Sequence, residues 1–439
     1  MKILFLTSYA VSHIIPIKSF ILKLQSMGHD VVCLINSQNI DYCKENCINY
    51  IVYPNNYWKK KHREEAMRKD KKMITYAEEK DFIKFYDEFL SKDSIGIFNY
   101  YEDVSLKIEE FIDVFCPNVV FRDSTDIYWM KIKNKEKYES IKTVGYITNN
   151  LYSWDYLMNS WNYILPNFLG IVDYLLSVPK EYLINFKSHL EKIYQETASN
   201  LNEDYIRPFY QYDPLEKVNI IFSQKSLQPI LNNRNNILIC SPSKSDFIVE
   251  KNVSNTIKRF CKDKLIYIAT GSFMSREINY YSDILKIINE KLPNYKIIIS
   301  GGKATKQIKS IVNEMGINQK VLVKQRVPQL FVLKNSSIFI TSGGMNSIKE
   351  AIFYKTPMIV FPISSEQRLN GMILEHLKIG ITTYKFPSSM NFFENHILSI
   401  LDINIDENFK QLSFDYDNVS EVVNNVFKKV YMDDNENTD

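Results

Sequence analysis

One stretch of the sequence combines glycines and polar side chains in an arrangement that could bind a phosphate group. Gly343 and Gly344 follow a short apolar run and precede a segment with helical spacing, which opens at Asn346 and Ser347. The first N–H groups of a helix attract anions, because they lack partners within the helix and lie at the positive end of its dipole. A glycine also lets the backbone approach a ligand without an intervening Cβ atom. The stretch therefore predicts a phosphate site at the start of this helix.

The next polar side chains along this stretch are suited to bind hydroxyl groups. Glu350 lies on the first turn of the expected helix, where its carboxylate could accept hydrogen bonds from two vicinal hydroxyls, such as those of a ribose. Glu366 and Gln367 follow a second apolar run, Met358 to Phe361. In open α/β sheets, ligands bind at the carboxyl ends of the strands. A carboxylate and an amide at such an end make this a stronger candidate site than a glycine pair alone.

These residues resemble the donor-binding motif of the family 1 UDP-glycosyltransferases, and most of all that of the bacterial macrolide-type enzymes. The matched positions are Val327-Pro328-Gln329-Leu330, Gly343-Gly344-Met345-Asn346-Ser347, Glu350, Pro357, Pro362 and Glu366-Gln367. The resemblance implies that Gly344, Asn346 and Ser347 bind the diphosphate of a nucleotide-sugar. It also implies that Glu350 binds the ribose, and that Glu366 and Gln367 bind hydroxyls of the transferred sugar.

Two positions of the motif differ from the family pattern. Ser342 stands where the family usually has a histidine that donates to the diphosphate, and a hydroxyl can donate but cannot carry charge. The sequence leaves open how this change affects donor affinity, and whether the nucleotide is UDP or TDP. Arg326 stands where many members stack an aromatic residue on the uracil, and a guanidinium can also stack on a base. The implied donor contacts are completed by Val327, Gln329, Gly343, Gly271 and Ser272.

A histidine near the amino terminus could act as a general base. His13 follows an apolar run that begins at Lys2, and it lies three residues before Pro16. An imidazole with a pKa of about 6.5 can take a proton at neutral pH. A solvated loop histidine is the alternative reading of this position taken alone. In the family, a His-x-x-Pro in this loop is the base, so the resemblance implies that role for His13.

A base of this kind needs an orienting partner, and two aspartates are candidates. Asp123 follows the short apolar run Val119 to Phe121. The resemblance implies that its carboxylate binds the second nitrogen of His13, which would fix the tautomer and stabilise the imidazolium. The alternative for Asp123 is a cap on the next helix, and Asp126 is its rival for the orienting role.

Apolar runs alternate with segments of helical spacing in both halves of the chain. They lie at residues 2–7 and 31–35 in the first half, and at 265–269, 296–300 and 321–324 in the second. This alternation predicts doubly wound α/β domains. The resemblance implies the GT-B fold, in which two Rossmann-like domains face each other across a cleft.

The same pattern indicates where the domains divide, and the resemblance implies their roles and the return of the last helix to the first domain. Residues 1–235 form the acceptor-binding domain, and residues 236–412 form the nucleotide-sugar-binding domain. Residues 413–439 provide a helix that crosses back to the first domain, followed by an acidic tail.

The composition is that of a globular protein, and it argues against nucleic-acid-binding, zinc-binding, secreted and membrane-spanning proteins. The chain has 439 residues, of which 45% are hydrophobic and 24% charged, and its net charge of +3 is too balanced for a nucleic-acid-binding protein. Its six cysteines show neither a CxxC pair nor zinc spacing, so we expect free thiols in a reducing compartment. The apolar amino terminus is too short for a signal peptide, and the apolar stretch 161–178 is interrupted by polar residues. We therefore expect a cytoplasmic enzyme without stable membrane insertion.

These features lead to one hypothesis and one alternative. We expect an inverting, metal-independent glycosyltransferase that moves a hexose from a UDP-sugar to a hydroxyl of a small hydrophobic acceptor. The donor is a co-substrate, with UDP-glucose as the family default, and no cofactor is expected. Aromatic side chains between residues 146 and 176 could line the acceptor site, although core packing explains them equally well. The alternative is a catalytically weak or inactive binding protein with an altered donor site.

Overall fold

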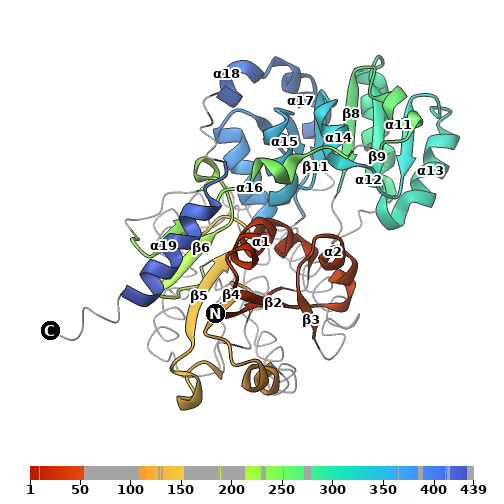
Figure 1. Ribbon diagram of the computed structural model, residues 1–439. Helices are drawn as coiled ribbons and strands as arrows, with labels where there is room; N and C mark the ends of the chain where they lie inside the picture. Colours follow the sequence, from red (N-terminus) through yellow and green to blue (C-terminus); the bar gives the residue numbers. More distant parts are fainter. Residues whose placement is uncertain are drawn as a thin grey trace. The chain divides into compact units, whose positions relative to one another are not determined.

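The computed structural model consists of two compact α/β units (Figure 1). Among the described residues, unit 1 comprises those up to Ser243 together with residues 416–432, and unit 2 runs from Lys244 to Leu412. Outside the described residues lie positions 9, 54–107, 127–128, 130–131, 153–187, 189–212, 229–233, 251, 271–277, 364, 384–388, 411, 413–415 and 433–439. The predictions for Gly271, Ser272, the stretch 161–178, most of the acceptor aromatics and the acidic tail fall on these positions.

Unit 1 is built on a sheet of parallel strands in the order β3-β2-β1-β4-β5-β6-β7. Side chains of β1 alternate between two cores, because Ile3 and Phe5 pack on one face of the sheet while Leu4 and Leu6 pack on the other. Coverage of both faces explains why β1 reads as a continuous apolar run. The strands are β1 Lys2–Leu6, β2 Asp30–Ile35, β3 Tyr50–Val52, β4 Val119–Asp123, β5 Lys142–Ile147, β6 Val218–Ile221 and β7 Ile237–Ile239.

The helices of unit 1 begin with two short 3-10 turns that connect β1 to its first α-helix. These are η1 Val11–His13 and η2 Ile15–Ile17, with Pro16 in the first turn of η2. Among the described residues, the α-helices of this unit include α1 Lys18–Ser26, α2 Ile40–Glu45 and α19 Val419–Met432, and residues 108–115 are also helical. Further 3-10 turns are η3 Ser37–Asn39, η4 Glu136–Tyr138 and η6 Lys225–Leu227.

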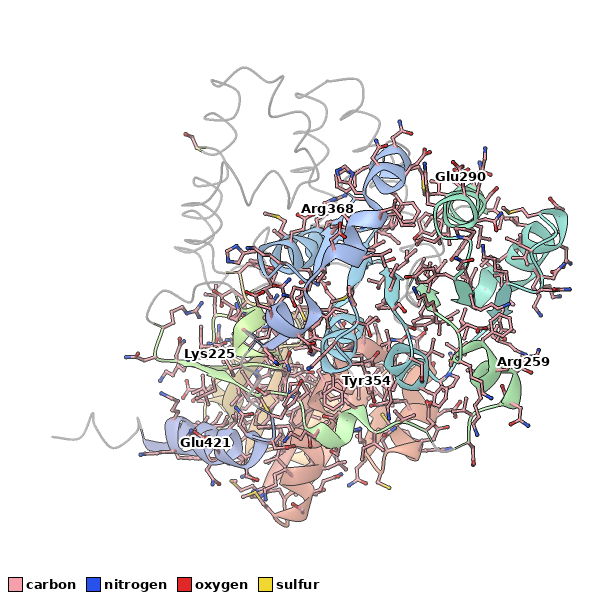
Figure 2. All side chains as sticks on the ribbon, turned by 90° about the horizontal axis from the view of Figure 1, so that it is seen from above. Lys225, Arg259, Glu290, Tyr354, Arg368 and Glu421 are labelled. Atoms are coloured by element: carbon pink, nitrogen blue, oxygen red, sulfur yellow. The ribbon has the colours of Figure 1, made fainter. Side chains whose placement is uncertain are left out.

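The last helix of the chain, α19, packs on unit 1. It contacts α1 and the strands β5, β6 and β7, next to which it lies in Figure 1. Its buried valines recur every three or four residues and therefore share one face: Val419, Val422, Val423, Val426 and Val430. Glu421, labelled in Figure 2, is exposed on the other side. Unit 1 is thus completed by residues far from the rest of it in sequence.

The expected boundary between residues 235 and 236 falls just before β7. This strand pairs with β6, so residues 237–243 lie with unit 1 and not with unit 2. The polar segment before β7 joins two neighbouring strands of one sheet, β6 and β7. In the sequence, such a connection looks the same as a linker between domains.

Unit 2 has a second parallel sheet, in the order β10-β9-β8-β11-β12-β13. The strands are β8 Leu265–Ala269, β9 Lys296–Ser300, β10 Val321–Lys324, β11 Ile338–Thr341, β12 Met358–Val360 and β13 Gly380–Thr382. The helices are α11 Asn255–Phe260, α12 Ile278–Lys291, α13 Thr305–Glu314, α14 Gln329–Lys334, α15 Met345–Phe353, α16 Ser365–His376, α17 Ser389–His396 and α18 Ile405–Lys410, and the 3-10 turns are η7 Lys244–Phe247, η8 Gly302–Ala304 and η9 Leu398–Asp402. Two parallel α/β units confirm the predicted fold class.

The start of unit 2 is fastened to the helix that follows its glycine turn. The hydroxyl of Tyr354, labelled in Figure 2, donates to the carbonyl of Phe247, and the Phe247 ring stacks on Phe353. The segment that enters unit 2 therefore packs against the end of α15. No helix among the described residues is both long and apolar enough to span a membrane.

Replacing Val423 by alanine tests the contribution of α19 to unit 1. Val423 is fully buried, so losing two methyl groups there should lower the free energy of unfolding by roughly 1–3 kcal/mol. Glu421→Ala, on the exposed face of the same helix, should change it by less than about 0.5 kcal/mol. Urea denaturation monitored by circular dichroism measures the free energy of unfolding of both variants. Equal losses in the two variants would contradict the packing of α19 on unit 1.

Candidate functional site

The glycine turn between β11 and α15 requires a glycine at its first position. Gly343 has φ +86, a left-handed conformation that side chains disfavour. A Cβ atom there would lie 2.7 Å from Cγ1 of Val360 and 3.2 Å from the carbonyl oxygen of Gln367. Gly344 has an extended backbone and occupies the N-cap position of α15, where it supplies no side-chain cap. The turn therefore packs closely against Val360 of β12 and Gln367 of α16. The N-cap residue of α15 makes no side-chain hydrogen bond to the start of the helix.

Glu350 and Ser347 on α15 are joined to other elements of unit 2 through Gln329. The Gln329 Nε2 donates to the Glu350 carboxylate and, at 3.3 Å, to the Ser347 hydroxyl. Its Oε1 accepts a hydrogen bond from the Tyr267 hydroxyl at 2.8 Å. Gln329 lies at the start of α14 and Tyr267 lies on β8. The Glu350 carboxylate, which is expected to bind ribose, is therefore linked to α14 directly and to β8 through Gln329.

Burial changes the protonation of Glu350. It raises the pKa of this carboxyl to about 7, although the hydrogen bond from Gln329 and the positive charge of Lys349 act in the opposite direction. Near neutral pH, Glu350 therefore changes between a hydrogen-bond donor and an acceptor.

The first turn of α16 lies against the same glycine turn. Gln367 Oε1 accepts a 2.7 Å hydrogen bond from the backbone N–H of Ile363, which closes the connection from β12 into the helix. Glu366 is half-buried beside it. The structure therefore brings the glycine turn, Glu350 and the Glu366-Gln367 pair into one part of unit 2.

The two positions that depart from the family pattern have different surroundings. The Ser342 hydroxyl is buried and donates to the carbonyl of Thr270 at 3.0 Å. Its hydrogen is therefore donated to the residue that follows β8, and the role of Ser342 at a diphosphate stays a prediction. Arg326 is exposed after β10, and Val327 next to it is half-buried.

The histidine and the aspartate of unit 1 meet at the carboxyl edge of the sheet. His13 ends η1, and its Nδ1 lies 2.8 Å from Oδ2 of Asp123, the last residue of β4. The contact forms because β1 pairs with β4, so the loop after β1 passes the end of β4. Asp123 is fully buried, whereas the His13 side chain is 19% exposed. A carboxylate accepts the hydrogen on Nδ1, which leaves the lone pair of the neutral imidazole on Nε2.

Two threonines complete the surroundings of this pair. Thr125 donates to Asp123 Oδ1 through its backbone N–H at 2.9 Å and through its hydroxyl at 2.6 Å. Thr148, just after β5, places its hydroxyl 3.3 Å from His13 Nδ1. Both oxygens of Asp123 therefore have partners, which fixes the carboxylate that orients the imidazole. The rival, Asp126, accepts a hydrogen bond from the backbone N–H of Trp129 at 3.2 Å.

The sequence reasoning missed Thr125, Thr148 and Tyr267. Thr148 follows an apolar strand at the sheet edge where His13 lies, so its place in the strand order could have indicated it. The contacts of Thr125 and Tyr267 depend on local backbone geometry and on side-chain orientation, which no spacing pattern encodes. Within the part of the chain that the structure describes, no group of three histidines, cysteines or carboxylates is placed to hold a metal ion.

A comparison with protein families finds a match in unit 2. Residues 313–415 match the family described as UDP-glucoronosyl and UDP-glucosyl transferase. The predicted family resemblance is confirmed. The segment matched to this UDP-glycosyltransferase family contains the glycine turn, α15 with Glu350, and α16 with Glu366 and Gln367.

Individual relatives agree with the family match. A Bacillus subtilis protein named uncharacterized UDP-glucosyltransferase YojK is 25% identical over 215 residues, which are 47% of this chain and 51% of the relative. The match thus spans about half the length of that protein. A solved structure of the glycotransferase of kitacinnamycin has a TM-score of 0.64 at 14% identity, over 98% of this chain and 99% of the other. A solved structure of a UDP-glucose: anthocyanidin 3-O-glucosyltransferase in complex with UDP has a TM-score of 0.62 at 13% sequence identity. This match covers 98% of this chain and 99% of the other. At sequence identities this low, the two matches show that this chain has the same fold as the two enzymes, and nothing more.

The raised pKa of Glu350 predicts a specific dependence of stability on pH. In the unfolded chain this carboxyl ionises near pH 4.5, whereas in the folded chain it keeps its proton until about pH 7. The free energy of unfolding therefore falls as pH rises from about 4.5 to about 7, and Glu350 contributes roughly 1–3 kcal/mol to this fall. Glu350→Gln should remove that loss and unfold at higher urea than the parent at pH 8, but not at pH 4.

The exposed Glu290, labelled on α12 in Figure 2, provides the matched control. Glu290→Gln should leave the pH dependence of the urea midpoint as in the parent. A parent and a Glu350→Gln variant with parallel pH profiles would contradict the burial of this carboxyl.

Proposed function

We propose that the protein is an inverting glycosyltransferase that moves a hexose from a UDP-sugar to a hydroxyl group of a small acceptor. The observation that carries the proposal is the 2.8 Å hydrogen bond between His13 and Asp123 at the carboxyl edge of unit 1. It gives a chain with a UDP-glycosyltransferase motif a general base that is oriented to accept a proton.

Unit 2 provides the donor half of the proposed reaction. The N–H groups at the start of α15 face the diphosphate, Glu350 binds the ribose, and Glu366 and Gln367 bind hydroxyls of the hexose. The helix start supports the first assignment, because its N-cap residue, Gly344, has no side chain to cap it and the positive end of the helix dipole lies there. The lack of a charged residue at Ser342 makes the helix start the main source of attraction for the diphosphate.

Unit 1 provides the acceptor half. His13 Nε2 takes the proton of the acceptor hydroxyl while its oxygen forms a bond to C1 of the hexose. The bond from C1 to the diphosphate oxygen breaks in the same step, so the configuration at C1 inverts and UDP leaves with the electron pair. Asp123 stabilises the imidazolium that forms. The start of α15 stabilises the charge that develops on the leaving diphosphate.

The identities of both substrates are part of the proposal. We propose UDP-glucose as the donor, because the names of the Bacillus relative and of the anthocyanidin enzyme both specify glucosyl transfer. We propose a small, hydrophobic, hydroxylated acceptor, since two enzymes that share the fold are named for kitacinnamycin and for anthocyanidin.

Replacing His13 by alanine tests the base. Loss of a general base should lower UDP release from UDP-glucose, with a panel of hydroxylated aromatic acceptors, by about 10²–10⁴-fold. The Kd for UDP, which unit 2 binds, should stay within about twofold of the parent value. A coupled assay for UDP and isothermal titration calorimetry measure the two quantities.

His29 provides a control in the same unit, because it precedes β2 at the opposite edge of the sheet. His29→Ala should keep the parental rate. Unchanged turnover in His13→Ala would reject its role as base. A parent protein that binds UDP but releases none from UDP-glucose, with or without acceptors, would favour the inactive binding protein over the transferase.

A further inference from the structure

Asn370 connects the glycine turn to α16. It lies on the second turn of α16 with 1% of its surface exposed, and its Nδ2 donates to the carbonyl oxygen of Gly343 at 2.9 Å. Because a carbonyl can only accept, this contact fixes which end of the carboxamide faces the turn. The Oδ1 atom finds no donor among the described residues, so the contribution of this side chain lies in its N–H groups.

The same amide nitrogen lies near the carboxylate that is expected to bind sugar hydroxyls. Nδ2 of Asn370 is 3.5 Å from Oε1 of Glu366, one helical turn earlier. One amide group therefore faces both the glycine turn and Glu366. A carboxylate held by a donor loses part of its rotational freedom, so its position relative to the turn is restricted.

The contact with Gly343 also determines the direction of the next N–H group. The carbonyl of Gly343 and the N–H of Gly344 belong to one peptide group, and in a trans peptide they point in opposite directions. With its oxygen held towards α16, this peptide directs the Gly344 N–H away from α16. No described residue accepts a hydrogen bond from that N–H, and the space beside Gly344 is open to a distance of 4 Å from an added Cβ.

We propose that Asn370 is a positioning residue for the donor site. It holds the Gly343–Gly344 peptide so that the Gly344 N–H points at the diphosphate, and it holds Glu366 in place for the hexose. This inference rests on the proposed function, since it assigns Asn370 to the same nucleotide-sugar site. Asn370 touches neither part of the ligand and acts through Gly344 and Glu366.

A merely structural role would affect all ligands of unit 2 alike, whereas a positioning role affects the diphosphate selectively. Asn370→Asp replaces the donor by an oxygen that repels both the Gly343 carbonyl and Glu366. The Kd for UDP should rise by about tenfold or more, as for a lost hydrogen bond to a charged group. The Kd for uridine, which lacks phosphate, should change by less than about twofold. Calorimetry measures UDP binding, and NMR titration measures uridine binding.

Asn335→Asp is the matched control. Asn335 also lies in unit 2 and donates from its Nδ2 to a backbone carbonyl, that of Phe331 at 2.7 Å. This variant should bind UDP and uridine as the parent does. If Asn370→Asp does not fold, Asn370→Ala removes the donor without adding charge, and the same selective loss of UDP affinity is expected.

The outcomes separate this inference from the proposed function. A parent protein that binds no UDP rejects the proposed function and this inference together. A parent that binds UDP, with an Asn370→Asp or Asn370→Ala variant of unchanged UDP affinity, rejects only the role of Asn370. Equal losses for UDP and uridine also reject it, because they indicate a general effect on unit 2.

Discussion

The candidate donor site depends on one backbone conformation, the positive φ of Gly343. This conformation helps to turn the chain from β11, which ends at Thr341, into α15, which begins at Met345. It also brings the turn into contact with Val360 and with the first turn of α16, where a Cβ atom would not fit. The positions of the helix start, of Glu350 one turn later and of the Glu366-Gln367 pair all follow from this turn.

Unit 1 reaches a comparable arrangement through strand pairing. Parallel strands place their carboxyl ends at one edge, so His13 after β1 and Thr148 after β5 meet near Asp123, the last residue of β4. His13 and Asp123 are 110 residues apart in the sequence. The donors of Thr125 and the imidazole of His13 occupy both oxygens of Asp123, and the carboxylate is buried without an unpaired oxygen. The site is thus held by hydrogen bonds between residues whose places are set by the sheet.

The sequence predicted what depends on spacing and not what depends on side-chain direction. The fold class, the strand before each glycine or polar residue, and the carboxyl-edge positions of His13, Asp123 and Glu366 follow from alternating apolar runs. The direction of the Ser342 hydroxyl, the link from Gln329 to Glu350 and the contact of Asn370 with Gly343 depend on rotamers and on neighbours distant in sequence. The assignment of β7 to unit 1 depends on pairing with β6, which a polar connection does not reveal.

A crystal structure of the full chain with UDP tests the central claim most directly. The account predicts that the diphosphate lies within hydrogen-bond distance of the backbone N–H groups of Gly344, Asn346 and Ser347, with the ribose hydroxyls at the Glu350 carboxylate. UDP bound elsewhere on unit 2, or at this turn with the ribose away from Glu350, would contradict it.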